Sequence, residues 1–106
     1  MRENVNHPKH YQQKGRKECI VEMEELYGTY ITAVFCLTNA YKYLYRAGNK
    51  AGNTKEQDIQ KALWYYTWVK NKQMPLFEML NRGIIDEPRE EQKLYLYLKD
   101  IFEKEN

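Results

Sequence analysis

The sequence lacks any apolar run of the roughly 20 residues that a membrane-spanning helix needs. It begins with the polar stretch MRENVNHPKHYQQKG, which has no hydrophobic segment of the kind found in secretory signals. Its 106 residues include only two cysteines, with no CxxC motif and no zinc-type histidine spacing nearby. We therefore expect a cytoplasmic protein with reduced thiols and no metal site.

The sequence also has only a small excess of positive over negative charge. The net charge of +2 at pH 7 is too small to predict binding to duplex nucleic acid. The positive charge is nevertheless concentrated, because five basic and two acidic residues lie between Lys42 and Lys61, whereas acidic residues prevail from Asp86 onward. A local basic patch of this kind favours a small anionic ligand over a long polyanion.

Apolar residues recur at helical spacing in five segments, and no segment alternates with period two for long enough to predict a strand. The expected helices span residues 16–27, 29–47, 54–72 and 76–83 and the region after Pro88. In the second helix we expect one buried apolar stripe of Ile31, Val34, Leu37, Tyr41 and Leu44. The sequence thus predicts a single all-α domain, a compact bundle of four to five helices. It comprises an extended N-terminal arm (1–16), a helical core (17–72) and C-terminal helices (73–106).

The stretch RAGNKAGNTKEQD joins the second and third expected helices and resembles a phosphate-binding loop in composition. It lacks the GxxxxGK[ST] order, and no strand precedes it, which excludes a Walker loop. Gly48 fits a left-handed position at the end of a helix. Thr54, with Gln57 three residues later, fits a capping box. The glycines therefore predict a capped turn.

Candidate binding residues lie on the helices that flank this turn. They follow i, i+3, i+7 spacing, which places each set on one helix face: Asn39, Lys42 and Arg46, and then Asp58, Lys61 and Tyr65. Because a short turn joins the helices, we expect antiparallel packing and a shared basic cleft. Arginine and lysine suit phosphate, asparagine suits a base edge, and a ring suits stacking. Asp58 could hold magnesium or a sugar hydroxyl, or orient a lysine. Solvated helix faces with ordinary ion pairs are the alternative.

His7 and His10 flank Pro8 in the N-terminal segment. Two histidines three residues apart could bind a metal, but no third ligand accompanies them, so we assign no metal there. They are either arm residues or residues that reach the ligand.

The segments VNHPKHYQ, FCLTNAYKYLYRAGNK and DIQKALWYY, in this order, resemble a family of small phage-encoded proteins. The family pattern reads approximately NHPxHY…GNAxKYxxRxGxK…D…KAxWY, and the match extends from Asn6 to about Tyr66. The family was catalogued as one of unknown function, and a nucleotide kinase-like activity is attributed to a coliphage member. The chain departs from the pattern at Thr38, where the pattern has glycine. The resemblance implies ligand binding by Asn39, Lys42, Arg46, Lys50, Asp58, Lys61, Tyr65, His7, His10 and Tyr11.

Three functions remain open at this point. The resemblance implies phosphoryl transfer to a (deoxy)nucleoside monophosphate in the cytoplasm of an infected cell, with Mg²⁺ as the cofactor. This hypothesis predicts that Arg46→Ala abolishes turnover and leaves the fold intact. The second is a non-catalytic sponge for a nucleotide signal of host defence. The third is a protein–protein inhibitor of a host factor. The ring-rich segment KLYLYLKDIF either closes the bundle or forms a self-association surface, and we expect a homo-oligomer whose second chain could complete the cleft.

Overall fold

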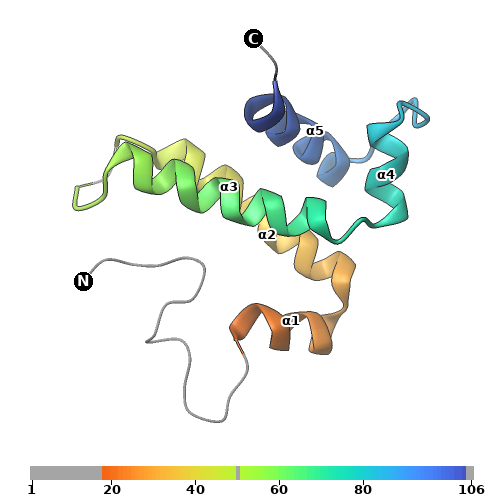
Figure 1. Cartoon of the computed structure of the whole chain (residues 1–106), viewed down its shortest axis with the longest axis horizontal. Helices are drawn as coiled ribbons and strands as arrows, with labels where there is room; N and C mark the ends of the chain where they lie inside the picture. Colours follow the sequence, from red (N-terminus) through yellow and green to blue (C-terminus); the bar gives the residue numbers. More distant parts are fainter. Residues whose placement is uncertain (1–17, 50, 105–106) are drawn as a thin grey trace.

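Capping residues and glycines divide the part of the chain that the structure describes into five helices, shown in Figure 1. The structure is a computed structural model, and it describes residues 18–49 and 51–104. The helices are α1 (Cys19–Tyr27), α2 (Thr29–Arg46), α3 (Lys55–Asn71), α4 (Pro75–Asn81) and α5 (Glu90–Glu103). The described ranges contain no strand. The prediction of an all-α bundle is therefore confirmed, whereas the predicted arm lies outside the described residues.

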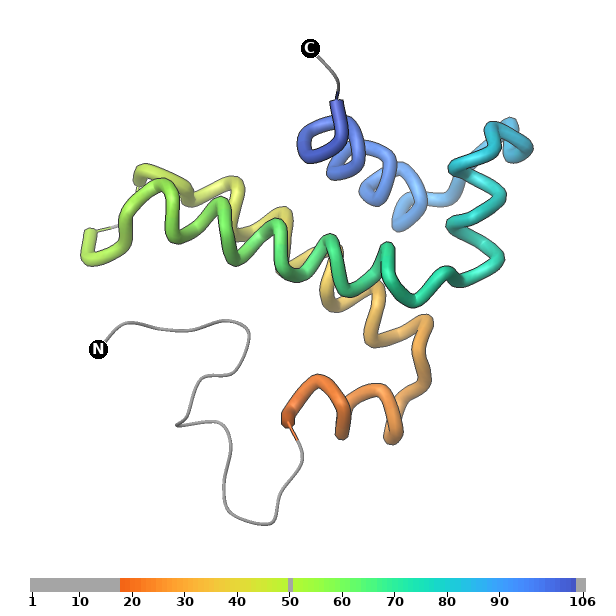
Figure 2. Tube along the Cα trace, viewed as in Figure 1, coloured from red at the N-terminus to blue at the C-terminus, as the bar shows by residue number. Residues whose placement is uncertain are grey.

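The turn between α2 and α3 has the predicted chemistry. Thr54 Oγ1 accepts a hydrogen bond from the Gln57 N–H at 3.0 Å, and Gln57 Oε1 accepts one from the Thr54 N–H at 2.9 Å. Gly48 has a φ of +81°, a conformation in which glycine alone avoids a steric penalty. The turn reverses the chain, so that α2 and α3 run side by side as an antiparallel helical hairpin (Figure 2).

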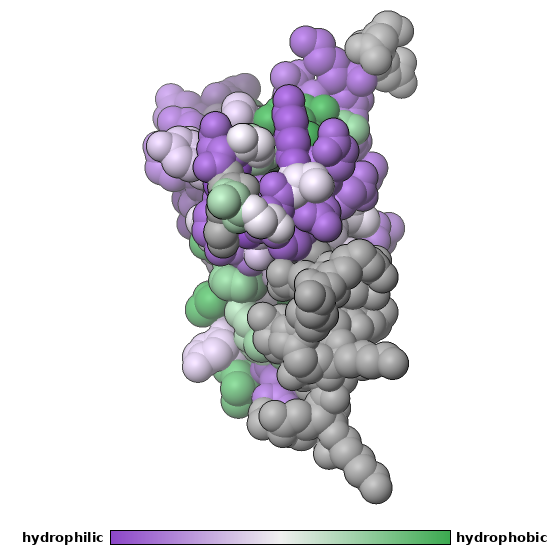
Figure 3. Space-filling view, turned by 90° about the vertical axis from the view of Figure 1, so that its left-hand side faces the viewer, coloured by the Kyte–Doolittle hydropathy of each residue, from purple (hydrophilic) through white to green (hydrophobic). Residues whose placement is uncertain are grey.

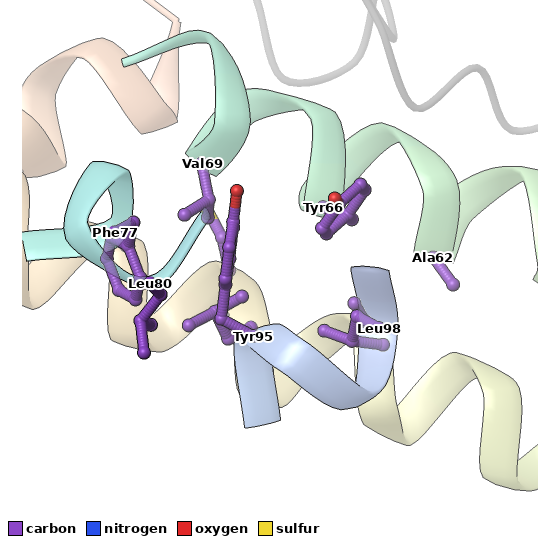
Figure 4. Close-up of a cluster of buried hydrophobic side chains, with 11 residues drawn as sticks. Ala62, Tyr66, Val69, Phe77, Leu80, Tyr95 and Leu98 are labelled. Atoms are coloured by element: carbon purple, nitrogen blue, oxygen red, sulfur yellow. The ribbon is translucent and has the colours of Figure 1, made fainter. Parts of the chain in front are cut away.

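The hydrophobic core lies where α5 and α4 cover this helical hairpin. Tyr95 of α5 is the central ring, with centroids 5.6 Å from Tyr66 of α3 and 4.7 Å from Phe77 of α4 (Figure 4). Leu98, one turn later, is fully buried, whereas Tyr97 lies on the exposed side of α5. One face of the ring-rich segment therefore closes the bundle, and the other faces outward.

The prediction of the buried face of α2 is correct for Leu37 and wrong in the rotation of the face as a whole. The structure buries mostly small apolar side chains: Ala33, Cys36, Leu37 and Ala40. Ile31 and Tyr41, which the sequence analysis placed in the core, are 58% and 48% exposed. Small residues on α2 meet buried Ala62 on α3, and small side chains at a contact let two helices approach closely. Close packing between α2 and α3 thus outweighs the burial of the larger side chains.

Glu24 of α1 links this helix to the start of α2 and to the end of α3. Its carboxylate accepts hydrogen bonds from Lys72 Nζ at 2.9 Å and from Thr29 Oγ1 at 2.8 Å. These two bonds hold the pKa of Glu24 below its usual value of 4.5. A lowered pKa in the folded state stabilises the fold above the pKa of the unfolded chain, and this stabilisation is lost as the pH falls through the folded pKa.

We expect the free energy of unfolding to fall as the pH drops below about 4.5, and we expect this fall to be shallower in the Glu24→Gln variant. Urea unfolding at a series of pH values measures the difference. Glu90→Gln is the matched control, because the Glu90 side chain is 89% exposed and should leave the slope unchanged. Equal slopes for Glu24→Gln and the wild type would contradict the assignment.

Candidate functional site

The residues predicted to bind a ligand on α2 and α3 lie near the turn of the helical hairpin. Arg46 near the end of α2 and Asp58 near the start of α3 meet across the turn, with Arg46 Nε donating to Asp58 Oδ1 at 3.4 Å. The Asp58 side chain is fully buried, and that of Arg46 is 24% exposed. The antiparallel arrangement therefore brings the two polar faces together, with the acid inside and the guanidinium toward the surface.

The ring of Tyr43 is the centre of this region. Its centroid lies 4.8 Å from Lys42 Nζ, 4.7 Å from Arg46 Cζ and 5.3 Å from Lys61 Nζ, all within the range of cation–π attraction. Tyr65 of α3 stacks on the same ring at 6.0 Å, with only 10° between the planes. We call the following set the Tyr43 cluster: Lys42, Tyr43, Arg46, Asp58, Lys61 and Tyr65.

The Tyr43 cluster contains more basic than acidic side chains. Three basic side chains surround one ring, and Asp58 is the only acid among them. Lys61 is only 4% exposed, so solvent screens its repulsion with the other cations less than at the surface. An anion placed beside these cations would remove this repulsion.

Arg46 is held from two directions. With the Asn53 amide oriented to satisfy both of its polar atoms, the amide oxygen accepts a hydrogen bond from Arg46 Nη2 at 3.3 Å, while Nε donates to Asp58. Asp58 Oδ2 is buried and has no hydrogen-bond partner among the described residues. A buried oxygen without a partner costs free energy. Stability alone therefore does not account for a carboxylate here, and the positioning of Arg46 supplies a reason for it.

Aromatic rings continue from the Tyr43 cluster along the side of the helical hairpin. Tyr65 makes edge-on contacts with Phe35 at 6.0 Å and with Trp64 at 5.0 Å. Figure 3 views the molecule from the end where α2 and α3 are joined, and hydrophilic residues predominate over that end. The site thus combines clustered cations with one stacked pair of rings and two further rings that contact it edge-on.

Residues 5–67 match the model of a family described as protein of unknown function, DUF3310. The match spans more than half of the chain. The chain belongs to the DUF3310 family. Neither a comparison with curated proteins nor one with solved structures gave a match. The DUF3310 match contains every member of the Tyr43 cluster, whereas α4 and α5 lie beyond it.

Within the DUF3310 match, the other predicted site residues fall into two groups. Asn39 lies half-buried on α2, one turn before Tyr43. Four residues lie outside the part of the chain that the structure describes: His7, His10, Tyr11 and Lys50. Tyr43 itself was absent from the predicted set, although it matches the tyrosine of the family pattern. Tyr43 lies four residues after Asn39 and three before Arg46, and this spacing places it on the same face of α2 as those two residues.

Potential metal ligands are not clustered among the described residues. These residues contain no group of three or more histidine, cysteine, aspartate or glutamate side chains with metal-binding geometry. In the same part of the chain, no helix is long and apolar enough to cross a membrane.

Proposed function

We propose that the Tyr43 cluster binds a nucleotide or a nucleotide-derived ligand. The observation that carries this proposal is the arrangement of three basic side chains around a ring that stacks on a second ring. A phosphate group is attracted to clustered basic side chains, and stacking on an aromatic side chain favours a base of any identity. The small net charge of the chain suits a single nucleotide better than a polymer.

The geometry gives each side chain a separate role in this proposal. Arg46 offers a planar fork to phosphate oxygens, and Asp58 fixes its direction through Nε. Lys42 lies at the edge of the cluster and adds a point charge for the phosphate. Tyr65, together with Phe35, presents ring surface to the base.

Two forms of the proposal differ in chemistry. In the form implied by the family resemblance, a terminal phosphoryl group passes from a nucleoside triphosphate to a (deoxy)nucleoside monophosphate, and two diphosphates result; the cations neutralise the charge that is transferred. In the second form, the protein retains a nucleotide signal unchanged, as a sponge against host defence. The second form is favoured by Asp58, because the only acid of the cluster is buried and ion-paired with Arg46, which leaves it badly placed to act as a base.

A nucleotide panel separates these forms. The protein is mixed with nucleoside mono- and triphosphates and cyclic nucleotides, with and without Mg²⁺, and the free and retained nucleotides are quantified by chromatography after filtration. New nucleotide species support the enzyme, and one nucleotide released intact supports the sponge. If the protein neither converts nor retains any nucleotide, the proposal is overturned.

For the nucleotide identified by the panel, Lys42→Ala should weaken binding about tenfold, because one charge-assisted contact is lost. Isothermal titration calorimetry measures the change. Lys93→Ala is the control, since Lys93 is an exposed lysine of α5 that pairs with Glu90 outside the cluster. If the two variants bind the nucleotide with equal affinity, Lys42 is not part of the binding site.

A further inference from the structure

The outward face of α2 carries large side chains that the fold leaves uncovered. We call the following set the α2 stripe: Ile31, Phe35, Thr38, Lys42 and Tyr45. Successive members are separated by four, three, four and three residues, the spacing with which a helix packs along a partner helix. All five are exposed, and Tyr45 reaches 77%. The core does not use this face, because the buried residues of α2 lie on its other side.

The exposed surface continues from α2 onto α5. Tyr41 stacks on Tyr45 at 6.5 Å and contacts Tyr97 of α5 at 6.1 Å. Ile101, one turn after Tyr97, is also exposed. Together with Ile31 and Phe35, these large side chains are between 39% and 77% exposed. They leave on the order of 600 Å² uncovered, which approaches the roughly 800 Å² that each partner buries in a stable interface.

The α2 stripe is nearly symmetric about Thr38. Ile31 lies seven residues before it and Tyr45 seven after, while Phe35 lies three before and Lys42 four after. A second copy of α2, packed antiparallel about a two-fold axis at Thr38, places Ile31 against the partner's Tyr45. The same operation places Phe35 against the partner's Lys42, a pairing of ring and cation. Such self-complementarity is what a two-fold interface requires.

Thr38 is suited to the centre of such an interface. Its hydroxyl lies 3.0 Å from the carbonyl oxygen of Val34 and 2.9 Å from that of Phe35, within its own helix. The hydroxyl group of Thr38 therefore keeps a hydrogen-bond partner when a dimer interface excludes water from it. The two copies of Lys42 are separated by about 12 Å along the helix axis, a distance at which salt screens most of their repulsion.

We propose that the α2 stripe, flanked by Tyr41 and by Tyr97 and Ile101 of α5, is the interface of a homodimer with antiparallel α2 helices. The interface lies beside the Tyr43 cluster, since Phe35 contacts Tyr65 and Lys42 belongs to both sets. The partner's Phe35 then packs beside the ligand-binding cations. The proposal does not depend on the identity of the ligand.

Sedimentation equilibrium over a concentration series tests the interface. The wild type should dimerise, and Thr38→Arg should raise the dissociation constant at least tenfold, because two added charges meet at the axis. The control is Ile84→Arg, which adds the same charge at an exposed position between α4 and α5. Circular dichroism melts monitor the fold of each variant. A monomeric wild type, or equal dissociation constants for the two variants, would overturn the proposal.

Cross-linking tests the geometry without disrupting it. In a Cys19→Ser background, which removes the exposed native thiol and leaves Cys36 buried, Thr38→Cys places two thiols together at the axis. A short bismaleimide should convert this variant to a covalent dimer and leave Ile84→Cys monomeric. Equal cross-linking of both variants, or none in Thr38→Cys, contradicts an axis at this residue.

Discussion

The Arg46→Ala variant should lose about 3 kcal/mol of its free energy of unfolding, because it leaves a buried carboxylate without its counter-ion. Asp58 is fully buried, and Arg46 Nε is its ion-pair partner at 3.4 Å. Urea denaturation measures the loss. The sequence alone predicted that this substitution would leave the fold intact, whereas the ion pair makes Arg46 a structural residue as well as a candidate ligand contact.

Two further variants separate these roles. Arg82→Ala removes an exposed arginine outside the Tyr43 cluster and should change stability by less than about 0.5 kcal/mol. The double variant Arg46→Ala, Asp58→Asn no longer contains a buried carboxylate without its counter-ion and should regain most of the lost stability. Nucleotide binding is then measured in the folded double variant. If Arg46→Ala is as stable as Arg82→Ala, the ion pair does not stabilise the fold.

Tyr95→Ala should cost about 4 kcal/mol, because it removes the central ring of the core. Tyr95 is 1% exposed, packs between Phe77 and Tyr66, and donates from its hydroxyl to Asn81 Oδ1 at 3.4 Å. A loss of this size is a large part of the total stability of a domain of this length. Thermal and urea unfolding followed by circular dichroism should show a much earlier transition.

Tyr27→Ala is the control for this substitution. It removes the same kind of ring from a position that is 61% exposed, and such a surface change alters stability by less than about 0.5 kcal/mol. Equal free energies of unfolding for the two variants would mean that α5 does not contribute to the core.

Features that depend on neighbouring residues could be predicted from the sequence. Thr54 and Gln57 satisfy one another's backbone donors, so the start of α3 is encoded within four residues. Gly48 takes the left-handed conformation that ends a helix. Because the turn is short, the approach of Arg46 to Asp58 also follows from the order of the helices.

Features that depend on packing in space could not be predicted in this way. Hydrophobicity ranks Ile31 and Tyr41 above Ala33 and Ala40, yet the close contact with α3 buries the small residues. The role of Tyr43 was hidden for a related reason. One of the cations around its ring comes from the other helix of the helical hairpin, and helical spacing within one segment does not show that contact.

The family match covers most of the helical hairpin but neither α4 nor α5, the helices that pack on it. The family match ends at residue 67, within α3, so α5 lies outside it. Yet Tyr66 of the matched region is buried by contact with Tyr95 and Phe102 of α5. A relative that shares only the matched region must shield this apolar surface by other means, because water-exposed apolar surface of this kind promotes aggregation. In this chain, the two C-terminal helices α4 and α5, which lie outside the family match, supply that shield.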